Sequence, residues 1–132
     1  FNMHLDLVPQ IDKPFAALVE DWNESGLLDN VLVLLMSEFG RTPKINQRLG
    51  RDHWPEAWSL CMAGCGIQRG LVLGKTTPNG AWVDGTEYDI GDIFHTVFEA
   101  MDIDPVGTEY HNNDQPLPIA HDDCGVIKEL LS

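Results

Sequence analysis

The chain has 132 residues and a formal net charge of −13, from 21 acidic and 8 basic side chains. This length fits one domain, and a composition that is 43% apolar, with aromatic residues present, excludes a disordered chain. Because the excess of negative charge repels nucleic-acid phosphates, we expect no nucleic-acid partner.

The chain lacks the signs of a membrane span or of a disulfide framework. No apolar run approaches the roughly 18 residues that a membrane span needs. Three cysteines, at positions 61, 65 and 124, are an odd number, and the first two lie in an apolar run where a free thiol behaves as a small hydrophobe.

The N-terminal sequence indicates a helix over residues 7–25. Val8, Ile11, Phe15 and Trp22 recur at helical spacing. Pro14 is expected to kink this helix or to delay its start. Because the chain opens at Phe1 almost directly into helical sequence, we expect residues 1–132 to be a single domain or a C-terminal fragment of a larger one. Its core is expected over about 5–105 and its tail over 106–132.

Three strands are predicted next, over 31–37, 57–63 and 71–73. The first is continuously apolar, a pattern typical of a parallel sheet covered by helices on both faces. A second helix is expected to begin after an N-cap at Asp89, with an apolar stripe that leaves His95 on its solvated side. The tail is expected to lie on the surface, with His111 and His121 in it, and to end in a short helix over about 124–131.

The candidate site follows the first strand. Ligands in open α/β sheets gather beyond the carboxyl ends of the strands, where Glu38 and Arg41 lie. A buried carboxylate needs a partner, so Glu38 is expected either to pair with Arg41 or to bind a metal. Asp52 and His53 are the second candidate pair, with an ordinary loop as the alternative.

The residues around this strand resemble a known family. The marks are "SEFGRTP" at 37–43, "GRDHWP" at 50–55, "GLVLGKTTPNGAWV" at 70–83 and "YDIGDIFHTVFEAMDIDP" at 88–105. Together they resemble the bacterial, sulfatase-like family of unknown function numbered fifteen-oh-one, within the alkaline phosphatase superfamily. The resemblance covers nearly the whole chain.

The resemblance implies the C-terminal portion of an alkaline-phosphatase-like three-layer α/β/α sandwich with a mostly parallel sheet. It implies metal ligands at Glu38, Asp52 and His53, a divalent ion (zinc or calcium), and Arg41 as the catalytic-site group that holds the anion. Relatives in the superfamily usually carry Asp-His or Asp-Asn where this chain has Glu38-Phe39, so one expected ligand is replaced. The nucleophile is expected before Phe1.

The function that this resemblance implies is metal-dependent hydrolysis of small sulfate or phosphate esters by the full-length protein, exported to the periplasm or cell surface. The fragment alone is expected to be inactive. The alternative is a non-catalytic binding or structural module that keeps the fold and has lost the site. A sheet cut from its neighbours exposes apolar faces, so we also expect association with the missing N-terminal portion or with a second copy.

Overall fold

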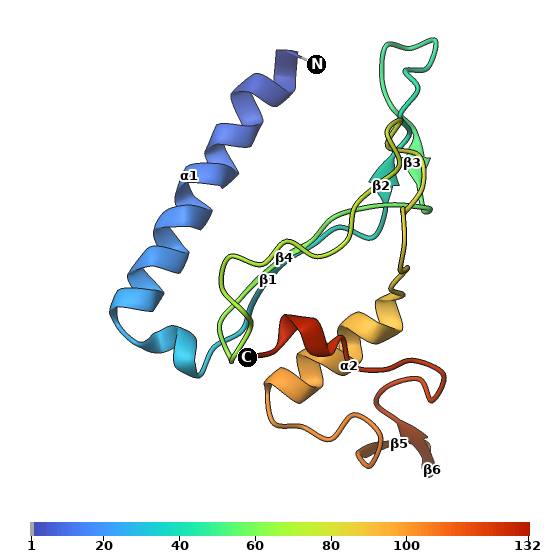
Figure 1. Ribbon diagram of the computed structural model, residues 1–132. Helices are drawn as coiled ribbons and strands as arrows, with labels where there is room; N and C mark the ends of the chain where they lie inside the picture. Colours follow the sequence, from blue (N-terminus) through green and yellow to red (C-terminus); the bar gives the residue numbers. More distant parts are fainter. Residues whose placement is uncertain (1) are drawn as a thin grey trace.

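The computed structural model describes residues 2–132, and its elements are arranged as an extended chain of small units (Figure 1). The order is α1 (Asn2–Glu24), η1 (Leu27–Asp29), β1 (Val33–Leu35), β2 (Gly40–Arg41), β3 (His53–Trp54), β4 (Cys61–Ala63), α2 (Ile90–Ala100), β5 (Glu109–Asn112), β6 (Gln115–Pro118) and η2 (Lys128–Leu130).

The expected three-layer sandwich with a mostly parallel sheet is wrong. The described strands form three two-stranded sheets, β1 with β4, β2 with β3, and β5 with β6, and each pair is antiparallel. Parallel strands need a crossover connection, usually a helix, whereas residues 36–60 carry only the β2–β3 hairpin between β1 and β4. The chain therefore turns back and pairs Val33 with Ala63 in the antiparallel sense.

The strand predictions located pairing segments but not their extent. Of the predicted strands 31–37 and 57–63, only Val33–Leu35 and Cys61–Ala63 pair. The predicted third strand, 71–73, is irregular, and its central Val72 is 89% exposed. An apolar run becomes a strand only where a partner offers backbone hydrogen bonds, and none of the described residues pairs with this segment.

Helix α1 begins earlier than predicted and runs through both Pro9 and Pro14 without interruption. It ends as expected near Gly26, whose φ of +73° is the left-handed conformation that glycine adopts without steric cost. Figure 1 shows α1 extending along one side of the molecule, joined to the rest through η1. Many of its apolar side chains are exposed, including Met3 at 71%, Leu5 at 76% and Ile11 at 58%. None of the described helices is long and apolar enough to cross a lipid bilayer.

Helix α2 begins where the sequence predicted. The Asp89 side chain accepts a hydrogen bond from the Gly91 N–H, and the Asp92 side chain accepts one from the Asp89 N–H at 2.8 Å, which completes a capping box. The prediction that His95 is solvated is wrong. His95 is 2% exposed and its Nε2 lies 2.7 Å from the backbone oxygen of His121, because the C-terminal segment covers that side of the helix.

The C-terminal segment is tied to α2 and to the middle of the chain. Fully buried Thr96 donates from its hydroxyl to the Asp92 carbonyl at 2.7 Å and accepts from the Ile127 N–H at 2.9 Å. The Ser132 N–H donates to the Gly66 carbonyl at 2.9 Å. The predicted terminal helix is a single 3₁₀ turn, η2, because Leu131, directly after it, is extended and forms an antiparallel bridge with Ile67.

Candidate functional site

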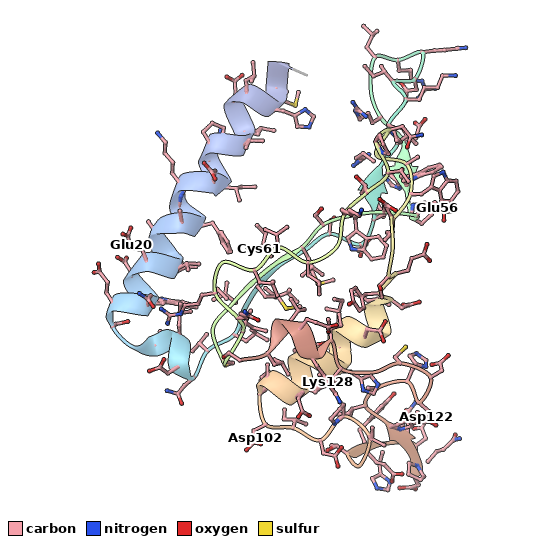
Figure 2. All side chains as sticks on the ribbon, viewed as in Figure 1. Glu20, Glu56, Cys61, Asp102, Asp122 and Lys128 are labelled. Carbon is pink, nitrogen blue, oxygen red and sulfur yellow. The ribbon has the colours of Figure 1, made fainter. Side chains whose placement is uncertain are left out.

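The β2–β3 hairpin positions two of the predicted site residues. Gly40 pairs with Trp54, and Arg41 pairs with His53. A Cβ atom at Gly40 would overlap the backbone carbonyl of Ala57, so glycine is required here by a close approach of two backbone segments. The residues 37–43 and 50–55, which are separate in the sequence, therefore meet in one hairpin (Figure 2).

Phe39 brings Arg41 and His53 together. The His53 ring stacks on the Phe39 ring with centroids 3.8 Å apart and planes 23° apart. The Arg41 guanidinium carbon lies 5.5 Å from the centroid of the same ring. Arg41 also donates from Nη1 to the Arg51 carbonyl at 3.3 Å. Both Arg41 and His53 are exposed, so the hairpin presents a guanidinium and an imidazole to solvent side by side.

Glu38 does not have the environment that the sequence suggested. It is exposed rather than buried, and within residues 2–132 it forms no salt bridge with Arg41. The ion-pair alternative for Glu38 is therefore wrong in this structure. An exposed carboxylate keeps its hydration and needs no compensating cation.

Asp52 organises the loop between β2 and β3. Its carboxylate accepts from the Asn46 amide at 2.7 Å, and its backbone N–H donates to the Thr42 hydroxyl at 3.1 Å. The side-chain oxygen of Asn46, Oδ1, in turn accepts from the N–H groups of Arg48 and Gly50. These bonds give the loop a defined shape, and they occupy one oxygen of the carboxylate that was predicted to bind metal.

The predicted metal ligands do not converge into a three-ligand set. Among residues 2–132, no group of three or more His, Cys, Asp or Glu side chains is placed to hold one ion. Asp52 faces the loop amide of Asn46, and His53 lies flat against Phe39. As they are placed, Glu38, Asp52 and His53 do not fit a complete divalent-metal site of this chain's own residues.

A second hairpin, residues 75–84, packs against the first and was missed as a site element in the sequence. The Lys75 ammonium and the Asp84 carboxylate pair at 2.9 Å at its base, and Thr76 forms an isolated bridge with Val83. The Trp54 indole N–H donates to the Ala81 carbonyl at 2.6 Å, which joins the two hairpins. The turn "TPNG" followed by a tryptophan was the signal in the sequence for this surface loop.

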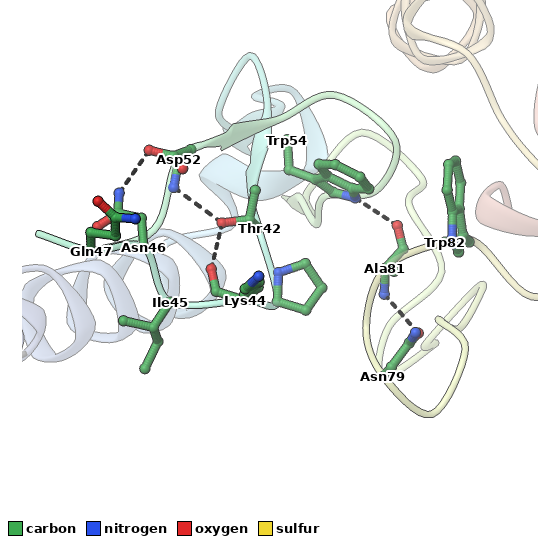
Figure 3. A pocket seen from close by; sticks show the side chains of 11 residues that line it. Thr42, Lys44, Ile45, Asn46, Gln47, Asp52, Trp54, Asn79, Ala81 and Trp82 are labelled. Carbon is green, nitrogen blue, oxygen red and sulfur yellow. Dashed lines mark hydrogen bonds between the residues drawn. The ribbon is translucent and has the colours of Figure 1, made fainter. Parts of the chain in front are cut away.

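An open groove of about 600 Å³ lies between the two hairpins (Figure 3). Residues of the first loop form one side, Trp54 and Trp82 contribute aromatic surface, and Asn79 and Ala81 form the other side. Trp82 is 51% exposed and meets Trp54 edge to face, with ring centroids 5.6 Å apart.

The charge of this region is opposite to that of the whole chain. Residues 41–51 hold four of the 8 basic residues, namely Arg41, Lys44, Arg48 and Arg51, and no acid, whereas the chain carries −13. Local positive charge on an acidic molecule draws small anions to one place. The charged residues that line the groove are Lys44 and Asp52, while Arg41, Arg48 and Arg51 belong to the same hairpin outside this lining, so the excess positive charge lies beside the groove and can draw small anions toward it.

Two groups outside this region have shifted pKa values. Backbone N–H groups of Gly107 and Val106 donate to the Asp104 carboxylate and hold its pKa below the usual range. Desolvation, followed by the charges of Asp123 and other nearby acids, raises the pKa of the Cys124 thiol. Neither group lines the groove, so both shifts concern the structure rather than the candidate site.

Comparison with known proteins identifies the family. The model of the family described as "Protein of unknown function (DUF1501)" matches residues 1–131, so the chain belongs to this family, and the resemblance noted in the sequence is confirmed at that level. No curated protein and no solved structure matches the chain.

Proposed function

We propose that this chain contributes the anion-holding part of a metal-dependent hydrolase of sulfate or phosphate esters, with turnover in the full-length protein. The observation that carries the proposal is the pairing of Arg41 with His53 across β2–β3, both in contact with Phe39. A guanidinium donates two parallel hydrogen bonds to a tetrahedral oxyanion, which suits Arg41 to hold the sulfuryl or phosphoryl oxygens.

The metal that the family resemblance implies needs ligands beyond those in this chain. Glu38, Asp52 and His53 do not form a complete set here, so we assign the remaining ligands and the nucleophile to another part of the full-length protein. A divalent ion, zinc or calcium, would polarise the ester oxygen when bound. The exported or periplasmic setting is proposed with the same function.

The hydrolase proposal is tested on the full-length protein with 4-nitrophenyl sulfate and 4-nitrophenyl phosphate, in the presence of zinc, calcium or manganese. We expect turnover of one ester with at least one metal. Arg41→Ala is expected to lower kcat/KM by about a hundredfold, the scale of losing one charged transition-state contact. Arg69→Ala is the matched control, because Arg69 is exposed and lies outside both the β2–β3 hairpin and α1, and it should leave kcat/KM unchanged. Lack of turnover under all metals, or equal turnover by Arg41→Ala, contradicts the proposal.

A non-catalytic binding module is the second candidate, and the groove between the hairpins favours it. An open, aromatic-lined groove beside a positive loop binds a ligand without needing a nucleophile or a metal. Full-length protein that binds a ligand in this groove and turns over neither ester supports this alternative.

We also propose that the chain associates through α1, with another part of the full-length protein or with a second copy. The chain of 14.7 kDa exposes 9912 Å². A compact monomer of that mass exposes about 6,900 Å². The excess, together with the exposed apolar side chains of α1, supports a partner surface on this helix.

A further inference from the structure

We infer that the groove between the 42–52 loop and the 75–84 hairpin binds an anionic saccharide, such as a sulfated or uronate-bearing oligosaccharide. The inference goes beyond the hydrolase proposal, because binding in this groove needs neither metal nor turnover. It rests on the shape of the groove, on the exposed indole of Trp82, on unused polar groups along the rim, and on the local positive charge.

The groove has a fixed shape because each wall is hydrogen-bonded internally and the walls are bonded to each other. The side-chain oxygen of Asn79, Oδ1, accepts from the Thr77 hydroxyl at 2.7 Å and from the Ala81 N–H at 3.1 Å, and these bonds fix the shape of the second hairpin. The Trp54 indole N–H donates to the Ala81 carbonyl and holds this hairpin against the first. A volume of about 600 Å³ falls within the roughly 300–1,000 Å³ of small-ligand sites.

Trp82 supplies the surface on which a sugar ring packs. Its edge-to-face contact with Trp54 fixes the ring plane at 68°, while half of the side chain stays open to solvent. The negative face of an indole attracts polarised C–H groups. A pyranose ring presents a row of such groups on one face and hydroxyls around its rim, so it uses both the indole and the polar edge of the groove.

The polar edge carries donors and acceptors that the described residues leave unused. Within residues 2–132, the Gln47 amide, the Lys44 ammonium and the Nδ2 of Asn79 form no hydrogen bond. Amides both donate and accept, which matches hydroxyl groups, whereas the ammonium only donates, which matches an anion. Figure 3 shows the side chains of this edge and the two tryptophans around one opening.

Charge selects an anionic saccharide among the possible occupants. Residues 41–52 carry four basic side chains against one acid, Asp52, which lines the groove together with Lys44, while the whole chain carries −13. A nucleic acid would contact the positive loop but be repelled by the remainder of the molecule. A simple inorganic anion has no apolar face to pack on the Trp82 indole. An apolar peptide has no anionic group to pair with the basic side chains.

The test is binding of dextran sulfate oligosaccharides to the 132-residue chain, followed by calorimetry and by Trp fluorescence. Unsulfated dextran oligosaccharides of the same length, inorganic sulfate, linear polyphosphate and a neutral apolar peptide are the comparison ligands. We expect the sulfated oligosaccharide to bind more tightly than each of these, and its affinity to fall as salt rises. Polyphosphate bound as tightly as the sulfated sugar, or the peptide bound more tightly, overturns the inference.

Variants locate the binding. Trp82→Ala is expected to raise the Kd for the sulfated oligosaccharide about tenfold, because an aromatic contact is lost. Phe94→Ala is the matched control, because Phe94 on α2 is 50% exposed and lies outside the groove, and it should bind as the wild type does. Unchanged affinity in Trp82→Ala overturns the inference.

Gln47→Ala keeps the test decisive if Trp82→Ala unfolds. Gln47 is exposed, lines the groove and forms no hydrogen bond within the described chain, so its truncation leaves the fold intact. We expect a several-fold higher Kd for both the sulfated and the unsulfated sugar. Lys44→Ala should raise the Kd for the sulfated sugar alone and reduce the salt dependence of that Kd. Lys13→Ala should change neither quantity. Failure of both groove variants to weaken binding contradicts the inference whatever the esterase assays show.

Discussion

Thr96 is the residue through which helix α2 holds the C-terminal segment. It is fully buried, and its hydroxyl both donates to the Asp92 carbonyl and accepts from the Ile127 N–H. Ile127 is 3% exposed and belongs to the small set of buried apolar side chains. A single hydroxyl therefore satisfies a buried backbone donor that the 3₁₀ turn after it cannot reach.

Thr96→Val should lower the free energy of unfolding by about 1–3 kcal/mol, because the buried Ile127 N–H loses its acceptor while the side-chain volume is kept. Urea titration followed by circular dichroism measures the change. Thr96→Ser keeps the hydroxyl and is expected to cost less than the valine. Equal losses in the two variants would assign the effect to packing rather than to the hydrogen bond.

At the scale of elements, the β2–β3 hairpin depends on a close backbone approach at Gly40. The structure pairs Gly40 with Trp54, and a Cβ atom there would overlap the Ala57 carbonyl. The absence of a side chain matters here, and the φ angle of Gly40 is not in the left-handed region.

Gly40→Ala should destabilise the hairpin by about 1–3 kcal/mol, since backbone atoms cannot yield as a flexible side chain does. Gly50→Ala is the matched control in the same hairpin, because a Cβ there would meet the Asn46 side chain at an ordinary 3.8 Å. The control is expected to be neutral or stabilising by roughly 0.4–1 kcal/mol. Comparable losses for both variants, measured by urea titration, would contradict the close approach.

At the scale of the whole molecule, few apolar side chains are buried among the residues that the structure describes. They are Leu28, Ala57, Ile67, Ile93, Ala120 and Ile127, of which only four are larger than alanine. The exposed face of α1 and the extended arrangement in Figure 1 follow from the same shortage of packing partners. A chain with this much exposed apolar surface is expected to associate with another protein surface that buries it.

The purified chain should self-associate at micromolar concentration, which light scattering measures. Leu5→Gln with Ile11→Gln should shift it toward monomer, because these α1 side chains are 76% and 58% exposed. Val72→Gln, at an 89% exposed position outside α1, is the control and should leave the mass unchanged. Monomeric wild type over the whole concentration range would contradict the association.

Local patterns in the sequence determined the elements whose stabilising contacts are local. The N-cap at Asp89, the end of α1 near Gly26 and the pairing segments within 31–37 and 57–63 follow from residues a few positions apart. The family also follows from the sequence, through motifs that span nearly the whole chain. The tertiary structure alone decided what each apolar or polar residue meets.

Strand direction, the burial of His95 and the exposure of Glu38 depend on segments distant in the sequence. The contact between the Trp54 and Trp82 rings also depends on distant segments. The hydrogen bond from Trp54 to Ala81, which joins the same two hairpins, links residues 27 positions apart. A continuous apolar run indicates that a segment packs, but not which partner it packs against. The free energy of burial depends on area removed from water and carries no direction, so only the folded chain fixes orientation and partner.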